Sequence, residues 1–275
     1  MCGIAGFCLT PASCSTAEEV TELAAQMLYD IEHRGTDATG ASWINTATNK
    51  RAILKHAMAA TKFVPTVGKY LCENAQTAIL HTRYATKGSP NNRDNNHPIA
   101  RGNIVLTHNG HILNDDEVFK RLGVQRNGAV DSEAAAALIA FTASKYHPTE
   151  VLGALRGGAA LAWIDSNDAT TLHLARVNSS PLWIGQTFKG NFLYGSTLEV
   201  LSNGAIMLDD SLEWEWQTDE RSYFKVRDGR VIEHEQISKS ASAIYSVASW
   251  QDKKIDADWK ARIHRKKVKQ DSLPF

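Results

Sequence analysis

The sequence predicts an α+β fold in which two sheets pack face to face with helices on the outside. The order of the patterns supports this, because strand-like runs come first, helical runs follow, and strand-like runs return. The length agrees, since 275 residues can bury a large core as one domain or as one domain with an appendage. With 43% hydrophobic residues, 22% charged residues and zero formal net charge, the composition is that of an ordinary globular protein, and nothing global suggests nucleic acid or a membrane.

The first elements in the chain are a strand and a helix. Gly3 and Gly6 flank an apolar run that predicts a buried strand closely approached by other backbone. Ser15 or Thr16 can cap the helix that follows, because serine and threonine accept hydrogen bonds from the first-turn N–H groups. The apolar residues of this helix recur at helical spacing at Leu23, Met27, Leu28 and Ile31.

The later elements follow from apolar runs separated by polar or glycine-rich turns. Strands are expected over 41–45, 51–55, 77–84, 104–108, 159–163, 172–177, 182–184 and 192–194. Helices are expected over 115–122 and 131–145. The strand-rich stretch 208–235 is expected to finish a domain that runs from 2 to 239. Residues 240–275, rich in Lys and Arg after Trp250, predict a basic tail that is flexible or docks a partner.

The cysteines indicate a reducing compartment. The four cysteines contain no CxxC pair and no metal-ligand spacing, so Cys8, Cys14 and Cys72 are expected to be free thiols. The chain shows no secretory signal and no run of roughly 18 apolar residues, which favours the cytoplasm. His81, His97 and His108 have no acidic partner at ligand spacing, so packing is favoured over a metal, and no cofactor is expected.

Cys2 is the strongest candidate for a reactive residue. Removal of Met1 would place a thiol and a free α-amine on one residue, and an amine with pKa near ~8 can take the thiol proton at neutral pH. The other interpretation is that Cys2 is an ordinary terminal residue.

Other stretches converge with Cys2. Together they resemble the glutaminase domain of class II glutamine amidotransferases, N-terminal-nucleophile hydrolases found in glucosamine-6-phosphate synthase and amidophosphoribosyltransferase. The resemblance runs from Cys2 to roughly Glu199, with its motifs in the family's order: Met1-Cys2-Gly3-Ile4, His33-Arg34-Gly35-Thr36-Asp37, His81-Thr82-Arg83-Tyr84-Ala85-Thr86-Lys87-Gly88, Thr107-His108-Asn109-Gly110 and Val130-Asp131-Ser132-Glu133. It implies the four-layer αββα sandwich of N-terminal-nucleophile hydrolases.

The resemblance also implies catalytic and substrate-binding roles. Cys2 would attack the side-chain carbonyl of L-glutamine, and the Asn109 amide with the Gly110 N–H would form the oxyanion hole. Arg83 would bind the α-carboxylate and Asp131 the α-ammonium of the free amino acid.

Further roles fall on the loop after Arg83 and on one supporting arginine. Thr86, with Tyr84 and the rest of the loop to Gly88, would close over the substrate, and Arg34 would support the nucleophile from behind. Related synthases often carry tryptophan and histidine where this chain has Tyr84 and Lys87. Tyrosine keeps a flat apolar lid, whereas Lys87 adds a charge whose purpose the sequence leaves open.

Several of these residues have simpler interpretations. Arg83 is compatible with a surface salt bridge, Asp131 with a helix cap, and Asn109-Gly110 with a turn. Only their joint occurrence with Cys2 favours the catalytic interpretation.

The leading hypothesis is a stand-alone domain that hydrolyses glutamine to glutamate and ammonia through a Cys2 thioester. The residues after about 200 are too few for a synthase domain, so the ammonia acceptor is expected on a separate chain. The alternatives are an N-terminal-nucleophile hydrolase of another amide, or a non-catalytic binding module of the same fold.

Overall fold

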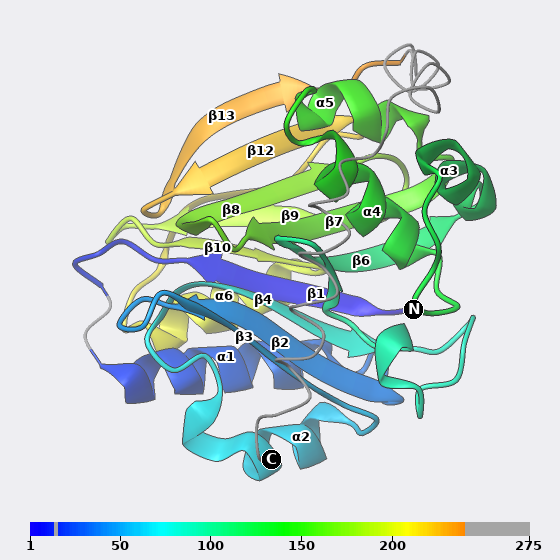
Figure 1. Cartoon of the computed structure of the whole chain (residues 1–275). Coiled ribbons are helices and arrows are strands. Elements are labelled where there is room, and N and C mark those ends of the chain that lie inside the picture. The colour runs from blue at the N-terminus through cyan, green and yellow to red at the C-terminus, as the bar shows by residue number, and fades with distance from the viewer. Residues whose placement is uncertain (14–15, 240–275) are drawn as a thin grey trace.

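Two antiparallel sheets form the centre of the protein, with helices on both outer faces (Figure 1). The computed structural model describes residues 1–13 and 16–239. This arrangement confirms the predicted αββα sandwich.

The first sheet has seven strands in the order β11-β9-β10-β1-β4-β2-β3. Their bounds are Gly3–Cys8 for β1, Ala38–Asn45 for β2, Lys50–His56 for β3, Ala75–Arg83 for β4, Trp183–Thr187 for β9, Phe192–Gly195 for β10 and Leu212–Gln217 for β11. β1 is central and pairs antiparallel with β4 and β10.

The second sheet has six strands in the order β13-β12-β8-β7-β6-β5. Their bounds are Ile99–Arg101 for β5, Ile104–Ile112 for β6, Gly157–Asp165 for β7, Asp168–Arg176 for β8, Ser222–Arg227 for β12 and Arg230–Gln236 for β13.

The helices divide between the two outer faces. Those against the first sheet are α1 (Ala17–Glu32), α2 (Ala60–Val67) and α6 (Leu198–Met207); those against the second are α3 (Asp115–Leu122), α4 (Ser132–Thr142) and α5 (Pro148–Val151). Short 3₁₀ turns occupy Gly68–Tyr70, Arg93–Asn95 and Leu152–Ala154. Thr16 caps α1 by accepting a hydrogen bond from the Glu19 N–H at 3.2 Å, which resolves the predicted choice between Ser15 and Thr16.

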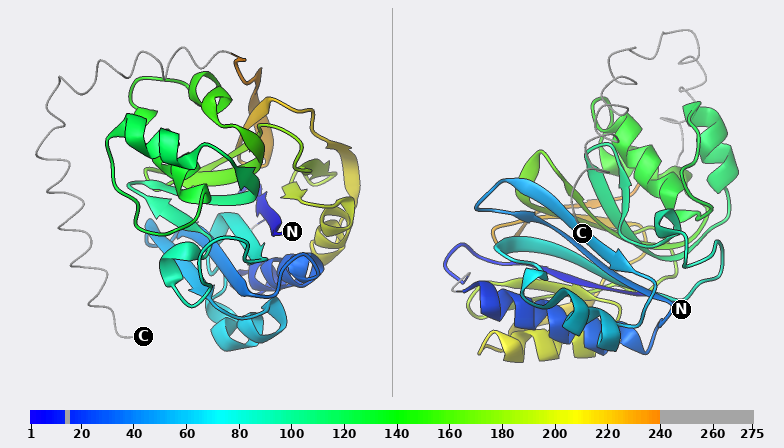
Figure 2. Two further views of the ribbon diagram at one scale, coloured as in Figure 1. Left: turned by 90° about the vertical axis from the view of Figure 1, so that its right-hand side faces the viewer. Right: turned by 60° about the horizontal axis from the view of Figure 1, so that its bottom comes forward.

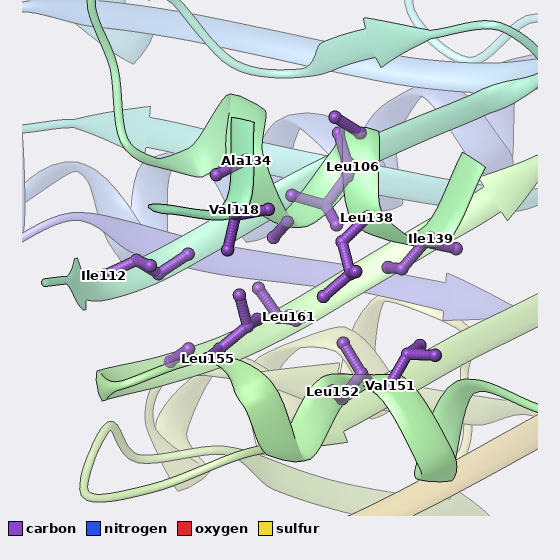
Figure 3. Packing of buried hydrophobic residues seen from close by; sticks show 14 of the residues in the cluster. Leu106, Ile112, Val118, Ala134, Leu138, Ile139, Val151, Leu152, Leu155 and Leu161 are labelled. Carbon is purple, nitrogen blue, oxygen red and sulfur yellow. The ribbon is translucent and has the colours of Figure 1, made fainter. Parts of the chain in front are cut away.

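Three apolar clusters hold these layers together, as expected when each sheet buries both faces. One lies between α1, α2, α6 and the first sheet, one lies between the sheets, and one lies between the second sheet and its helices. Figure 3 shows the last cluster, in which Leu138 and Ile139 of α4 face Leu106 of β6 and Leu161 of β7.

Three details differ from the expectations. β6 does not turn at Asn109-Gly110 but continues to Ile112, because Asn109 and Gly110 stay paired with Ala160 and Ala159 of β7. α4 spans Ser132–Thr142 rather than 131–145. α2 and α6 were not expected, and α2 contains Pro65, a residue that normally argues against a helix interior.

Some expectations fall outside the described residues. The basic tail 240–275 lies there, so the domain boundary at residue 239 stays a prediction, as does the cytoplasmic location. Cys14 also lies there, whereas Cys2, Cys8 and Cys72 are free thiols. Within residues 1–13 and 16–239, no helix has both the length and the apolar character to span a membrane.

Candidate active site

The candidate residues gather at one end of the sandwich, where β1 begins and β4 and β6 end. Gly3 pairs with Thr82, which places Cys2 beside Arg83 of the neighbouring strand. Asn109 and Gly110 come from the facing sheet. The left view of Figure 2 looks onto this end, with the N-terminus between the two layers.

The Cys2 thiol is held by the main chain of Tyr84. Its Sγ donates to the Tyr84 carbonyl oxygen at 3.5 Å and accepts from the Tyr84 N–H at 3.4 Å. Arg34 Nε donates to the Cys2 carbonyl oxygen at 2.9 Å, which agrees with the supporting position expected for Arg34. The nucleophile candidate is therefore fixed from two sides.

Burial raises the pKa of the Cys2 thiol above its ordinary value. The hydrogen bond with Tyr84 and the charge of Arg83 oppose this shift, and the charge of Asp131 adds to it. A thiol in this environment needs a base to become a thiolate at neutral pH.

Asn109 is linked to the nucleophile strand through Ser196. Asn109 Nδ2 donates to Ser196 Oγ at 2.8 Å, and the same oxygen accepts from Ile4 N–H at 2.8 Å and donates to the Ile4 carbonyl at 3.1 Å. One Nδ2 proton has no hydrogen-bond partner among the described residues, so Asn109 retains a donor. Sequence reasoning missed Ser196, whose only signal is a polar residue directly after a buried strand.

Gly110 occupies a position that only glycine fits. Its φ is +131°, in the region that L side chains rarely adopt, and a Cβ would lie 2.0 Å from the Gly158 carbonyl oxygen. The backbone of β7 therefore approaches β6 closely at this point.

Arg83 is 3% exposed and is turned toward its own loop. Its Nη2 donates to the Lys87 carbonyl at 2.5 Å and to the Gly88 carbonyl at 2.8 Å, while Nη1 donates to Asn96 Oδ1 at 2.9 Å. Burial lowers its pKa, and the charges of Cys2, Asp37 and Asp131 oppose the shift. Nε and one Nη1 proton are free of these bonds.

Asp131 stands at the N-cap position of α4 without capping the helix through its side chain. Its Oδ2 instead accepts from the Ile112 N–H at 2.6 Å and lies 3.6 Å from His111 Nδ1. The carboxylate thus joins the end of β6 to the start of α4.

The loop after Arg83 covers the thiol with main chain rather than side chains. Tyr84 is 56% exposed, and Thr86 is exposed as well. The structure thus brings together Cys2, Arg34, Arg83, Asn109 and the main chain of Tyr84, whereas within residues 1–13 and 16–239 the Thr86 side chain makes no hydrogen bond to any of them.

One cluster of side chains away from the candidate site could bind a metal ion. Within the described residues, one group has the geometry to hold an ion, namely His147, Glu233 and Glu235, whose ligand atoms lie within 4.8 Å of one another on α5's N-cap and β13. The His147 ring already lies between the two carboxylates, 2.7 Å from Glu233 through Nε2 and 3.5 Å from Glu235 through Nδ1.

A group of histidines lies between the sheets behind the candidate site. The rings of His81 and His97 stack at 4.0 Å, and His108 lies 6.5 Å from His97. Burial lowers the pKa of His81 to about 3 and the pKa values of His97 and His108 below their ordinary values. Burial thus favours the neutral form of all three rings.

Known proteins resemble this chain in sequence. A family model described as a glutamine amidotransferase domain matches residues 81–203. The glutamine–fructose-6-phosphate aminotransferase (isomerizing) of Acinetobacter baylyi is 31% identical over 217 residues, covering 73% of this chain and 32% of that protein. The Bradyrhizobium diazoefficiens enzyme of the same name is 30% identical over 258 residues, covering 89% of this chain and 40% of that protein. The chain thus spans less than half the length of these relatives.

Solved structures resemble the fold. A glutamine phosphoribosylpyrophosphate amidotransferase from B. subtilis superposes with a TM-score of 0.68 at 19% identity, over 86% of this chain and 50% of that chain. A glutamine aminotransferase class-II domain protein from Silicibacter pomeroyi superposes with a TM-score of 0.54 at 13% identity, over 86% of this chain and 99% of that one.

Proposed function

Since the chain belongs to the class II glutamine amidotransferases, we propose that it hydrolyses L-glutamine to glutamate and ammonia with Cys2 as nucleophile. The observation that carries the proposal is the placement of the Cys2 thiol. The thiol is held by the main chain of Tyr84, the residue after Arg83. Cys2 directly precedes β1, and Ile4 of that strand is linked through Ser196 to the Asn109 amide.

Before any turnover, the protein must mature by cleavage of the Met1–Cys2 peptide bond. Met1 is 80% exposed, so an aminopeptidase has access to it. The freed amine of Cys2 takes the thiol proton, which the buried thiol cannot readily lose without a base. One residue then supplies both the nucleophile and its base.

Attack of Sγ on the amide carbonyl carbon forms a tetrahedral intermediate with a negatively charged oxygen. The unused Nδ2 proton of Asn109 and the Gly110 N–H stabilise that oxygen. The Cys2 ammonium returns its proton to the leaving nitrogen, the C–N bond breaks, and ammonia departs. Water, deprotonated by the same amine, then cleaves the glutamyl thioester to release glutamate.

Arg83 and Asp131 select the substrate as a free amino acid. Their opposite charges match an α-carboxylate and an α-ammonium, and both act on Cys2 electrostatically. Thr86, at the exposed centre of the 84–88 loop, is proposed to touch the substrate when the loop closes. The Arg83 and Asp131 pair disfavours the alternative activity, which is hydrolysis of an amide without an amino-acid end.

The ammonia acceptor is proposed to be a synthase on a separate polypeptide. The two relatives described above are named aminotransferases and are more than twice as long as the region that matches this chain. Co-purification of a synthase, and faster glutamine turnover in its presence, would support this part.

The direct test is glutamine-dependent release of ammonia and glutamate by the purified protein and by Cys2→Ala. Wild-type turnover with none in Cys2→Ala is expected. Turnover of other amides in preference to glutamine would favour the alternative hydrolase. Retention of partner binding by both proteins, with turnover by neither, would favour a binding module.

A further inference from the structure

We propose that Lys87 is a positioning residue that holds the 84–88 loop over Cys2 through an ion pair with Asp115. This inference rests on the proposed function. It assigns a purpose to the lysine that the sequence comparison with related synthases left without one.

Lys87 contacts two different parts of the site. Its carbonyl oxygen accepts a hydrogen bond from Arg83 Nη2 at 2.5 Å, and its ammonium Nζ lies 2.7 Å from Asp115 Oδ2. The same residue therefore orients the substrate-binding arginine through its main chain and is anchored to α3 through its side chain.

Asp115 is the fixed half of the pair. Its side chain is 9% exposed, and its Oδ2 also accepts from Arg126 at 2.8 Å. Arg126 in turn lies over the Phe119 ring of the same helix at 4.5 Å. Burial would raise the pKa of Asp115, but the hydrogen bonds from Lys87 and Arg126 outweigh it and hold the pKa below its usual value. The anchor is thus ionised and rigid near neutral pH.

Lys87 is the movable half. Its side chain is 42% exposed, so water screens the ion pair and its opening costs little free energy. When the pair opens, the Lys87 and Gly88 carbonyls are free to leave Arg83, and the Tyr84 main chain is free to leave the thiol. α3 follows β6 after two residues, so the closed pair ties the loop to the element that carries Asn109 and Gly110.

The test compares Lys87→Met with Lys120→Met. Lys120 lies on α3 but makes no ion pair within the described residues, so its substitution removes a charge without breaking a pair. A partly exposed pair of this kind is worth about 0.2 to 1 kcal/mol, so the KM for glutamine should rise by a factor of about 1.4 to 5 in Lys87→Met with kcat little changed. Lys87→Arg keeps the charge and should restore most of the affinity. Raising the salt from about 0.05 to about 0.5 M should raise KM more in the wild type than in Lys87→Met, because only the wild type has the Lys87–Asp115 pair to screen.

Hydrogen–deuterium exchange over the peptide containing residues 84–88 gives a readout independent of turnover. Faster exchange in Lys87→Met and Asp115→Asn, but not in Lys120→Met, supports the role of the ion pair in holding the loop. This holds even if the protein is inactive, because inactivity would overturn only the proposed function. Unchanged exchange together with an unchanged KM in an active protein would overturn the role of Lys87.

Discussion

Ser196 joins the nucleophile strand to the oxyanion residue through a single hydroxyl. Its Oγ makes all three hydrogen bonds available to a hydroxyl, to the Ile4 N–H, the Ile4 carbonyl and the Asn109 amide. A buried hydroxyl that is fully satisfied stabilises one arrangement of its neighbours, and its loss leaves them unpaired. Ser196 therefore ties Asn109 to β1, the strand that begins directly after Cys2.

Ser196→Ala should lower kcat more than it raises KM, because the Asn109 amide acts on the developing oxyanion rather than on bound glutamine. The free energy of unfolding should fall by about 1 to 3 kcal/mol, since the Ile4 N–H and the Asn109 amide lose a buried partner, while the Ile4 carbonyl keeps the Ser196 N–H at 2.9 Å. Steady-state kinetics and urea unfolding measure both effects. Ser202→Ala on α6 is the matched control, because within the described residues its hydroxyl bonds only to its own helix, at 3.4 Å from the Leu198 carbonyl. Equal effects of the two substitutions would contradict this role.

The sequence indicated the chemistry of single residues better than their contacts. Cys2, Arg34, Arg83 and Asn109 could be placed together because each lies in a recognisable local motif. Ser196 could not, since its partner Ile4 is 192 residues away in the chain. Nor did the sequence reveal that the Nη2 group of Arg83 is bound by its own loop.

At the scale of elements, the segment before α4 depends on one buried carboxylate. Glu133 accepts from the Asn127 N–H at 2.8 Å and the Gly128 N–H at 2.9 Å, and it pairs with Arg101 at 2.9 Å. These contacts hold the loop that leads into Asp131.

Glu133→Gln should destabilise the protein by about 1 to 3 kcal/mol, because the partly buried Arg101 loses its carboxylate and keeps only the Gln125 carbonyl, and the Asn127 and Gly128 N–H groups lose a charged acceptor. The KM for glutamine should also rise as Asp131 shifts. Glu117→Gln is the control: its ion pairs with Arg121 and Arg156 are exposed and contribute little. Urea unfolding curves of the two variants should differ clearly, and coincident curves would contradict the account.

Element boundaries were predictable where local patterns and sheet pairing agreed. They agreed for β1, β4 and α1. They disagreed at Asn109-Gly110, where the local sequence predicts a turn but pairing with the neighbouring strand β7 keeps both residues in β6. α2 was missed because Pro65 normally breaks a helix, and here tertiary packing of Phe63 and Val67 outweighs that preference.

At the scale of the whole molecule, the two sheets are joined next to the site by neutral histidines. His81 comes from the first sheet and His108 from the second, and His81 Nε2 lies 3.1 Å from the His108 carbonyl oxygen. His97 stacks on His81, with Lys55 and Arg83 as the charged groups that act on it. Asp131 and His111 act on His108.

These histidines should make the fold sensitive to acid. In the unfolded chain a histidine titrates near ~6.5, whereas burial lowers the pKa of His81 in the folded protein to about 3. As the pH falls below ~6.5, histidines in the unfolded state bind protons while those in the folded state stay neutral. The free energy of unfolding therefore falls toward lower pH by up to about 1.4 kcal/mol per pH unit for each histidine.

Urea unfolding at about pH 7 and about pH 5 measures this loss together with that of His173, whose pKa burial also lowers to about 3, and the total should amount to several kcal/mol. His56→Asn, which removes an exposed histidine, should leave the difference between the two pH values unchanged. A free energy of unfolding that stays constant between these pH values would show that the buried rings do not control acid stability.

The most direct test of the central claim is the intact mass of the purified protein before and after reaction with 6-diazo-5-oxo-norleucine, followed by mapping of the N-terminal peptide. The account predicts loss of Met1 and one adduct on Cys2, with Cys8 and Cys72 unmodified because both are buried and their thiol pKa values are raised. Retention of Met1, or an N-terminal peptide without the adduct, would contradict Cys2 as the nucleophile.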